Sequence, residues 1–567
     1  MFQGRDLREV ILLIFTLPTF NMEVLAKAGE VGRQKHPRLN PHDVAYGTAG
    51  FRMRAENLDH IVYRMGLLSV LFSKHRLGVT GLMVTASHNP EEDNGVKLID
   101  TMGEMMPISW EKYATEVANA SDDRLPDVLG NIIKSENIDM NKPANVSVAM
   151  DTRSSSPALV QAAVDGIEAL NGKCNNFGLL TTPQLHYIVC CQNTQGQYGE
   201  PTELGYYRKL AAAFLKLNKD RKASKYVPDI YVDLANGVGA PKLRLLLNHL
   251  QGALNIRFIN DGSSGKLNHQ CGADFVKLYQ AAPIGIDLEP EMRCASFDGD
   301  GDRIVYFYKT VDGKFALLDG DKIATLFADY LNELLTSSGL KLSIGLVQTA
   351  YANGSSTRYI SDVMKIPVAC VPTGVKFLHH KAQDFDIGVY FEANGHGTVL
   401  FSENARKIIA FQALDDSLDD VRKNASIKLA TVMDLINQTV GDAMSDMLVV
   451  ETILSSRDWT CQDWDSAYTD LPSRQIKIKV EDRSVVETTD AERRTTKPAG
   501  LQEAIDDLAS QYKYGRAFVR PSGTEDVVRV YAEADTQANA DRLGYEVGLQ
   551  VYNLARGCGD KPTPPSH

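Results

Sequence analysis

Short apolar runs alternate with longer amphipathic segments along most of the chain. In residues 60–78, apolar side chains recur at helical spacing before Gly78, and this pattern predicts a helix that ends near that glycine. The recurring residues are Ile61, Met65, Leu68 and Phe72. Residues 81–84 form a short apolar run that predicts a strand. Strands alternating with helices are typical of an α/β protein.

The same alternation continues to the end of the chain. Further strands are predicted within residues 146–150, 228–239, 254–261, 294–309, 343–348, 385–401, 474–480 and 515–534. Further helices are predicted at 156–172, 241–250, 321–335, 501–512 and from about residue 537. Three strands end in a polar loop that contains or adjoins glycine or proline, with the sequences TASHNP, DGDGDR and EANGHG. Because ligands of open α/β sheets bind at the carboxyl ends of strands, these loops are the candidate site.

We expect three related α/β units, each with one such loop, and a different fourth domain. The units share a pattern without evident sequence identity. The expected limits are a leader at 1–36 that is disordered or misassigned, then domains at 37–192, 193–304, 305–440 and 441–567.

Composition narrows the functional class. The net charge of -12 disfavours a general nucleic-acid or anionic-membrane binder. The eight cysteines form no CxxC pair, so no zinc ribbon is indicated, and in a chain of this size they favour reduced thiols in the cytoplasm. The apolar run at 10–20 resembles a signal peptide, but it lacks a basic start and is too short to span a membrane. We favour a leader before the folded domain, with Met22 as an alternative start.

Three carboxylates separated by glycines stand in the loop DGDGDR: Asp298, Asp300 and Asp302. Such close carboxylates repel one another unless a cation neutralises them. Hard oxygen ligands favour Mg²⁺, Ca²⁺ or Mn²⁺. An EF-hand would need Gly and Glu where Arg303 and Lys309 stand, so that reading fails. A solvated acidic turn is the remaining alternative.

Two further loops carry groups that suit a sugar phosphate. In RPSGTEDVVR, an arginine fork, hydroxyls and a glycine backbone form a phosphate pocket, although PSGT is also a common turn. In FEANGHG, Glu392 could accept both hydroxyls of a vicinal diol, and Asn394 and His396 add donors. This second loop alone is also compatible with an ordinary turn.

The loop TASHNP places Ser87 beside His88. It lacks the G-x-S-x-G elbow of a hydrolase nucleophile, and by itself it favours a turn before Pro90. A phosphorylated serine, however, would need a cation to balance its charge, and the aspartate loop could bind one.

Together, GTAGFR, TASHNPEEDNGVK, DGDGDR, EANGHG and RPSGTEDVVRVYAEA, in this order, resemble the α-D-phosphohexomutase superfamily and, within it, the eukaryotic phosphoacetylglucosamine mutases. The resemblance covers about residues 37–555. It implies three α/β units with mixed sheets and a smaller α+β C-terminal domain around a central cleft.

The resemblance also implies roles for individual residues. Ser87 would be the phosphoserine, flanked by Arg52 and His88, with Lys97 as the proton acceptor. An unperturbed lysine stays protonated at pH 7, so neighbouring cations would have to lower its pKa. Ser87, Asp298, Asp300 and Asp302 would hold one Mg²⁺. The implied substrate-binding residues are Arg303, Thr373, Gly374, Glu392, Ala393, Asn394, His396, Arg520, Pro521, Ser522, Gly523, Thr524 and Arg529.

The implied reaction interconverts the 6-phosphate and 1-phosphate of N-acetylglucosamine through a 1,6-bisphosphate, which also primes the enzyme, on the route to UDP-N-acetylglucosamine. The bisphosphate must turn round, and the C-terminal domain is expected to close and exclude water. We expect a monomer or weak dimer without nucleic-acid or membrane partners. The alternatives are a phosphoglucomutase or phosphomannomutase, a non-catalytic sugar-phosphate-binding regulator, and a metal-dependent phosphatase.

Overall fold

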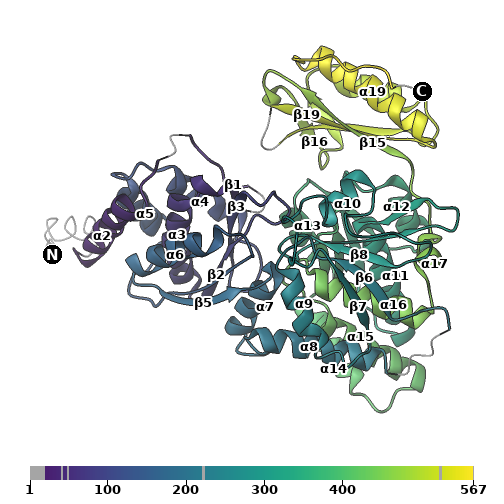
Figure 1. Cartoon of the computed structure of the whole chain (residues 1–567), viewed down its shortest axis with the longest axis horizontal. Coiled ribbons are helices and arrows are strands. Elements are labelled where there is room, and N and C mark those ends of the chain that lie inside the picture. Colours follow the sequence, from purple (N-terminus) through teal and green to yellow (C-terminus); the bar gives the residue numbers. More distant parts are fainter. Residues whose placement is uncertain (1–18, 40–41, 48–49, 220–223, 523–525, 566–567) are drawn as a thin grey trace, which may run out of the picture. The chain divides into compact units, whose positions relative to one another are not determined.

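The computed structural model describes residues 19–39, 42–47, 50–219, 224–522 and 526–565 (Figure 1). The chain divides into two compact units, residues 1–206 and 207–567. Three sheets are mixed and a fourth is antiparallel, so the expected α/β fold with a different C-terminal domain is confirmed.

The first unit contains a five-stranded sheet of order β1-β3-β2-β4-β5. Its strands are β1 (Phe51–Arg54), β2 (Val79–Val84), β3 (Asp93–Ile99), β4 (Asn145–Met150) and β5 (Lys173–Leu179). Its helices are α2 (Thr19–Lys35), α3 (Asp59–Arg76), α4 (Ile108–Asn119), α5 (Leu125–Ser135), α6 (Ser156–Ala169), α7 (Thr182–Asn193) and α8 (Glu203–Leu217), the last of which continues into the second unit. The predicted helix at 60–78 is α3, which ends at Arg76 and is followed by Leu77 in a left-handed conformation with φ 56°.

Helix α2 corrects the expected leader. Residues 19–35 form a helix that packs against α5 and α6. Leu25 and Ala28 are buried in the core of the first unit, so this part of the chain is integral to the domain. The rest of the apolar run at 10–20 lies outside the described residues, apart from its last two positions.

The second unit contains two further mixed sheets. One has the order β10-β9-β8-β6-β7, and the other has the order β12-β11-β13-β14. Their strands are β6 (Asp229–Asp233), β7 (Asn255–Ile259), β8 (Cys294–Phe297), β9 (Ile304–Lys309), β10 (Phe315–Leu318), β11 (Ile344–Thr349), β12 (Val368–Val371), β13 (Ile387–Phe391) and β14 (Gly397–Phe401). The helices are α9 (Gly239–Leu247), α10 (Ala273–Tyr279), α11 (Gly320–Ser338), α12 (Gly354–Arg358), α13 (Val375–Ala382), α14 (Glu403–Ala413), α15 (Asp420–Leu435), α16 (Ala443–Arg457) and α17 (Cys461–Asp465).

The three mixed sheets share one arrangement of strand directions. In each sheet, two parallel pairings are followed by an antiparallel one: β5-β4-β2 with β3, β7-β6-β8 with β9, and β12-β11-β13 with β14. Each candidate loop is the connection across that antiparallel pair. The structural repeat therefore places the three loops at equivalent positions.

The C-terminal part is a smaller α+β domain. Strands β15 (Ser473–Lys479), β19 (Val527–Glu533) and β18 (Arg516–Pro521) form an antiparallel sheet. Helix α19 (Gln537–Leu554) packs along it, as Figure 1 shows, and α18 (Leu501–Ala509) packs against α19 and β18. A separate hairpin consists of β16 (Glu487–Thr489) and β17 (Arg494–Lys497).

Two expected domain limits cut through packed elements. Strand β9 pairs with β8, and β10 pairs with β9, so the second sheet continues beyond residue 304. Helix α16 packs on α11 and α15, so the third part continues beyond residue 440.

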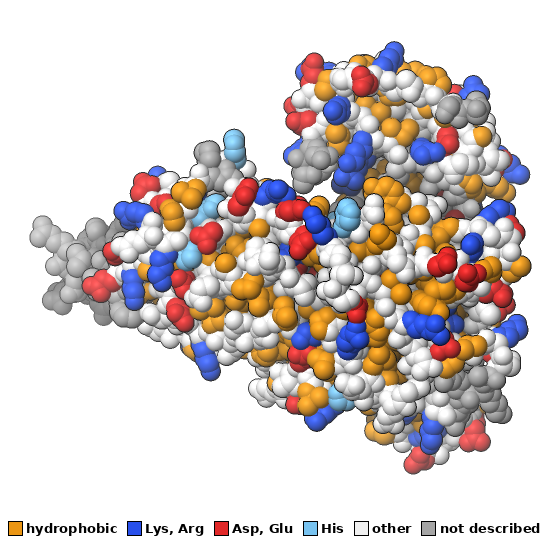
Figure 2. All heavy atoms as spheres, viewed as in Figure 1, with side chains coloured by type: hydrophobic (Ala, Val, Ile, Leu, Met, Phe, Trp, Pro, Cys, Tyr) orange, Lys and Arg blue, Asp and Glu red, His pale blue; other side chains and the backbone are white. Residues whose placement is uncertain are grey.

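Surface charges of both signs are interspersed on the face drawn in Figure 2. None of the described helices combines the length and apolar character needed to cross a membrane.

Candidate active site

Ser87 lies in the loop between β2 and β3, is fully buried and has a left-handed backbone with φ 52°. A residue with a side chain adopts this conformation only at a cost, which the surrounding contacts must offset. Thr85 provides one such contact, because its Oγ1 accepts the backbone N–H of Ser87 at 3.0 Å. The loop is thus held in one conformation that presents the serine.

Asp151 and Arg153 support this loop, and the sequence analysis missed both. Asp151 Oδ2 accepts the Thr85 hydroxyl at 2.8 Å and forms a fully buried ion pair with Arg153. Arg153 Nη2 donates to the carbonyl oxygens of Ser87 and Asn89 at 3.2 and 2.8 Å. The available signal was the position of DTR directly after the predicted strand at 146–150, where polar residues reach the same sheet edge.

The strand register of the first sheet brings Arg52 and Lys97 to one face. Arg52 lies opposite Gly95 on β3, and Lys97 follows two residues later. Lys97 in turn lies opposite Met83 on β2, two residues before Thr85. Because alternate residues share a face, both cations lie on the face of Thr85. Lys97 is buried and His88 is half-buried.

The aspartate loop connects β8 and β9. One carboxylate oxygen from each of Asp298, Asp300 and Asp302 can be chosen so that all three lie within 4.8 Å of one another, and all three residues are buried. Asp298 Oδ1 also accepts the backbone N–H groups of Asp302 and Arg303, at 3.0 and 3.2 Å. Three buried carboxylates at this separation fit a hard divalent cation.

Backbone packing fixes the aspartate loop from another side. The carbonyl of Gly299 accepts the N–H of Val238 at 3.1 Å, and a Cβ on Gly237 would lie 2.3 Å from that carbonyl oxygen. Asp233 accepts the hydroxyl of Ser296 at the end of β8, and burial raises the pKa of this aspartate despite its hydrogen bonds. Asp233 thus supports the strand end that leads into the aspartate loop, as Asp151 supports the serine loop.

Arg303 follows the aspartates and lies beside two of them. Its Nε is 3.7 Å from Asp302 Oδ1 and 3.9 Å from Asp298 Oδ2, and its Nη1 is 3.4 Å from Asp274. Burial lowers the pKa of the guanidinium, but the neighbouring carboxylates raise it more, so the pKa lies above its ordinary value. Arg303 therefore offsets part of the negative charge of the loop.

The loop EANGHG contacts the aspartate loop. His396 is buried, and its Nδ1 donates to the carbonyl oxygen of Asp302 at 2.8 Å. The N–H of Ile304 donates to the carbonyl of Gly395 at 3.2 Å, and a Cβ on this glycine, at φ 88°, would lie 1.9 Å from the Ile304 carbonyl oxygen. His396 thus supports the aspartate loop. The sequence did not predict this role, since it suggested His396 only as a donor to the substrate.

Glu392, Ala393 and Asn394 are half-buried at the tip of the same loop. Asn394 Nδ2 donates to Glu392 Oε2 at 3.2 Å, which leaves acceptor capacity on the carboxylate. The carbonyl of Ala393 accepts the N–H of Gly320 at 3.4 Å. The tip therefore combines carboxylate and amide groups that suit hydroxyl groups.

The C-terminal loop joins β18 and β19. Arg520 lies directly opposite Arg529 in this hairpin, and Pro521 and Ser522 follow Arg520. The buried Nε of Arg529 has no hydrogen-bond acceptor in the described part of the chain. Two facing arginines favour an anion between or beside them. Gly523 and Thr524 lie outside the described residues.

Thr373 and Gly374 lie between β12 and α13 and meet the C-terminal domain through Glu492. Thr373 donates both its N–H and its hydroxyl to Glu492 Oε2, at 2.9 and 2.5 Å. Glu492 Oε1 forms an ion pair with Arg520 Nε at 3.1 Å. No feature of the sequence pointed to Glu492, because it lies in a polar turn distant from every motif.

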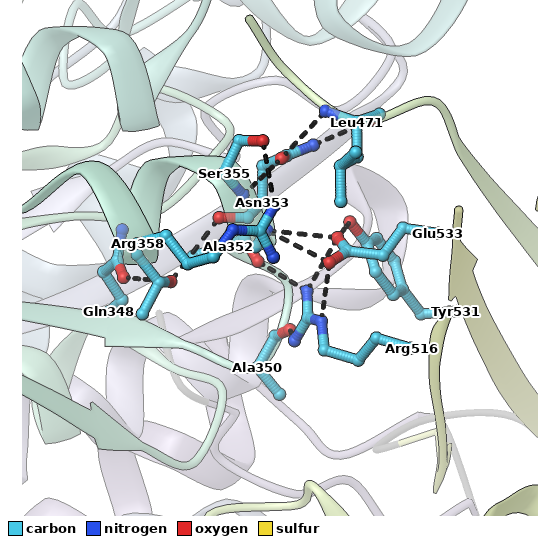
Figure 3. A network of polar contacts seen from close by, with 12 residues as sticks. Gln348, Ala350, Ala352, Asn353, Ser355, Arg358, Leu471, Arg516, Tyr531 and Glu533 are labelled. Atoms are coloured by element: carbon cyan, nitrogen blue, oxygen red, sulfur yellow. Dashed lines mark hydrogen bonds and ion pairs between the residues drawn. The ribbon is translucent and has the colours of Figure 1, made fainter. Parts of the chain in front are cut away.

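Figure 3 shows a second junction between these parts. Glu533 is buried and forms a two-pronged ion pair with Arg516, at 2.9 and 3.0 Å. Glu533 also accepts the N–H of Gly354 at the start of α12, at 3.2 Å. Arg516 donates to the carbonyls of Ala350 and Ala352 at 2.9 and 2.6 Å. This network fixes β18 and β19 against the third sheet.

Four family sequence profiles match the chain. "Phosphoacetylglucosamine mutase AMG1" domains II and III match residues 199–305 and 319–459. "Phosphoglucomutase/phosphomannomutase" domain I matches 62–125 and 123–197, and the C-terminal domain of that family matches 476–547.

The curated relatives and solved structures agree. Phosphoacetylglucosamine mutases of Sus scrofa and Homo sapiens are 57% and 56% identical, covering 92% and 93% of this chain and 96% and 97% of their own. The Aspergillus fumigatus N-acetylphosphoglucosamine mutase solved with GlcNAc-6P and magnesium is 47% identical, with a TM-score of 0.89 over 95% of this chain and 100% of that one. A serine-to-alanine variant of the Aspergillus fumigatus enzyme was solved with glucose 1,6-bisphosphate. It is 47% identical, with a TM-score of 0.88 over 95% of this chain and 100% of that one. The chain therefore belongs to the phosphoacetylglucosamine mutase family of the α-D-phosphohexomutase superfamily.

Proposed function

We propose that this chain interconverts N-acetylglucosamine 6-phosphate and N-acetylglucosamine 1-phosphate through a phosphoserine and a 1,6-bisphosphate, in the synthesis of UDP-N-acetylglucosamine. Family membership carries this proposal, since the relatives are phosphoacetylglucosamine mutases and cover nearly the whole chain. The ligands of the Aspergillus fumigatus structures, GlcNAc-6P, magnesium and glucose 1,6-bisphosphate, support it.

The donor set of the aspartate loop fits magnesium. Its three buried carboxylates supply hard oxygen ligands, and a phosphate oxygen on Ser87 would be a further ligand. When bound, Mg²⁺ neutralises charge on the transferring phosphoryl group and on the oxygen that leaves.

The residues of the chain then have separate tasks in the transfer. A sugar hydroxyl attacks the phosphorus of phosphorylated Ser87, the P–Oγ bond breaks, and Lys97 accepts the hydroxyl proton. Arg52 and His88 stabilise the charge on the transferring group. The sequence and the burial of Lys97 on the face of Thr85 support these assignments.

The remaining loops hold the sugar and its idle phosphate. Glu392, Asn394 and the neighbouring Ala393 bind the hydroxyls, and a diol held by one carboxylate tolerates both orientations of the bisphosphate. The phosphate that is not reacting is held by the C-terminal loop, through Arg520, Pro521, Ser522, Gly523, Thr524 and Arg529. Arg303, Thr373, Gly374 and His396 complete the proposed substrate-binding set.

We propose four domains with adjusted limits, at about residues 19–198, 199–318, 319–459 and 473–565. We also propose a cytoplasmic enzyme, monomeric or weakly dimeric, without nucleic-acid or membrane partners. The eight cysteines form no disulfide in the described structure, which supports a reducing compartment, and the net charge of -12 argues against nucleic-acid and anionic-membrane partners.

The proposed function can be tested by measuring turnover and the phosphorylation of Ser87. With a trace of sugar 1,6-bisphosphate and Mg²⁺, the wild-type chain should convert N-acetylglucosamine 6-phosphate, and mass spectrometry should find phosphate on Ser87. Ser87→Ala should abolish turnover, whereas Ser361→Ala, at an exposed serine, should not. Full activity of Ser87→Ala would reject the phosphoserine. Higher kcat/KM with glucose 1-phosphate would favour a phosphoglucomutase, and net release of inorganic phosphate would favour a phosphatase.

A further inference from the structure

Glu492 lies in the turn between β16 and β17, and its carboxylate is bound by residues from two different parts of the chain. Oε2 accepts the N–H and the hydroxyl of Thr373. Oε1 pairs with the guanidinium of Arg520. The side chains of Arg520 and Glu492 are 15% and 17% exposed, so the pair is largely shielded from water.

The groups around this carboxylate form the donor set of an anion site. A backbone N–H, a hydroxyl and a guanidinium are the donors that proteins use to bind phosphate oxygens. Arg529 lies across the hairpin from Arg520, and its buried Nε has no acceptor among the described residues. Glu492 satisfies only part of this positive charge.

The turn presents Glu492 at a cost. Asp490, Ala491 and Glu492 have φ values of 51°, 55° and 69°, three consecutive left-handed residues of which none is glycine. Such backbone persists only where contacts stabilise it. Arg493 supplies some of them, since it donates to the carbonyl and carboxylate of Asp490. The contacts of Glu492 with Thr373 and Arg520 supply the others.

We propose that Glu492 is an internal anion that occupies the phosphate subsite of Arg520 and Thr373, and that the idle phosphate of the substrate must displace it. This inference rests on the proposed function. A carboxylate and a phosphate repel each other and compete for the same donors. Glu492 therefore weakens the binding of the idle phosphate.

Weaker binding of the idle phosphate suits a reaction in which the bisphosphate intermediate must turn round. If both phosphates of the bisphosphate were held at full strength, its reorientation and release would be slow. Glu492 returns to Arg520 and Thr373 as the phosphate leaves. It thus sets the substrate affinity without contacting the reacting atoms.

The test measures binding of inorganic phosphate and of N-acetylglucosamine 6-phosphate by calorimetry. Glu492→Gln and Glu492→Ala should each bind inorganic phosphate roughly tenfold more tightly than the wild type, because a competing charge-assisted contact is lost. KM for the sugar phosphate should fall similarly. Glu487→Gln is the matched control, since Glu487 lies on the same hairpin and pairs with exposed Lys497 at 2.8 Å. It should change neither value.

Unchanged or weaker phosphate binding in both Glu492 variants, with their unfolding temperatures preserved, would overturn the proposal and make Glu492 a support for Arg520. Phosphate binding needs no turnover. A chain that lacked mutase activity but bound phosphate more tightly in the variants would reject the proposed function, while leaving Glu492 as the carboxylate that occupies a phosphate subsite.

Discussion

Arg153 Nη2 donates to the backbone carbonyl of Ser87 at 3.2 Å, and this arginine is itself fixed by a fully buried ion pair with Asp151. The same aspartate accepts the hydroxyl of Thr85, which holds the N–H of Ser87. Both ends of the serine residue are therefore tied to one buried ion pair. Geometry at a phosphoryl donor affects rate more than binding, since misplacement of about 1 Å can cost about 100-fold.

We expect Arg153→Lys to lower kcat by about 10- to 100-fold with little change in KM, because a lysine cannot reach Asp151 and two carbonyls together. The lost charge-assisted hydrogen bonds should also lower stability by about 2 kcal/mol. Steady-state kinetics and thermal unfolding measure the two effects. Arg54→Lys, at an exposed arginine on β1, is the control. A wild-type kcat in Arg153→Lys would show that the serine loop keeps its geometry without the guanidinium of Arg153.

The left-handed backbone of Ser87 separates its chemical role from its structural one. Ser87→Ala and Ser87→Gly should both abolish turnover, since neither has a hydroxyl. At φ 52°, however, glycine carries no Cβ penalty, so the glycine variant should be more stable than the alanine variant by about 1 kcal/mol. Denaturant unfolding of the two variants makes the comparison. Equal or reversed stabilities would argue against a strained backbone at this position.

Asp300→Asn removes one of the three converging carboxylate charges while keeping the shape of the side chain. The Mg²⁺ concentration that gives half-maximal activity should rise about tenfold or more, and direct calorimetric binding of Mg²⁺ should weaken in parallel. Asp312→Asn, at an exposed turn, should leave both titrations unchanged. An unaltered magnesium titration in Asp300→Asn would remove this aspartate from the ligand set.

The sequence predicted what depends on local pattern. Helix α3, the strands that precede the loops of Ser87, Asp298 and Glu392, and the final hairpin all follow from apolar periodicity. The three loops follow from polar residues, glycines and a proline at strand ends. The structure added contacts between distant segments. Asp151 binds the Thr85 hydroxyl 66 residues earlier, and its partner Arg153 binds the carbonyl of Asn89 64 residues earlier. Glu492 lies 119 residues after Thr373. Such pairings arise from tertiary packing, which leaves no periodic signal in one sequence.

Helix α2 shows the same limit at the amino end. The family resemblance begins only at about residue 37, so we expected a leader before it. Leu25 and Ala28 are nevertheless buried against the first domain, because α5 and α6 offer an apolar surface that only the folded chain possesses. The expected domain limits at 304 and 440 were wrong for a related reason. The domains to which β9 and α16 belong are determined by the elements they pack against, β8 for β9 and α11 and α15 for α16, and not by their own sequences.

Glu533 at the junction in Figure 3 should be a determinant of stability for the C-terminal domain. Glu533→Gln removes the charge that Arg516 and the Gly354 N–H face, and breaking this largely buried pair should cost about 2 kcal/mol. Hydrogen exchange at the Gly354 amide should become faster, a local effect that general destabilisation would not confine there. Glu503→Gln, at an exposed glutamate on α18, is the control. Unchanged protection of Gly354 in Glu533→Gln would contradict the assignment.

Asp470, between α17 and β15, gives a prediction for pH. Burial and then the Asp319 carboxylate raise its pKa to about 7, although Lys322 and Lys277 oppose the shift. In the unfolded chain an aspartate has a pKa of about 3.9. Between that pH and about pH 7, the folded state therefore retains a proton that the unfolded state has released. The contribution of Asp470 to the free energy of unfolding should therefore fall as pH rises through this window and level off above about 7. Asp470→Asn cannot ionise, and its unfolding free energy, measured with urea from pH 5 to 8, should fall less steeply than that of the wild type. Asp507→Asn, at an exposed position on α18, should follow the wild-type slope. Parallel slopes for all three proteins would show that Asp470 ionises in the folded state as readily as in the unfolded one.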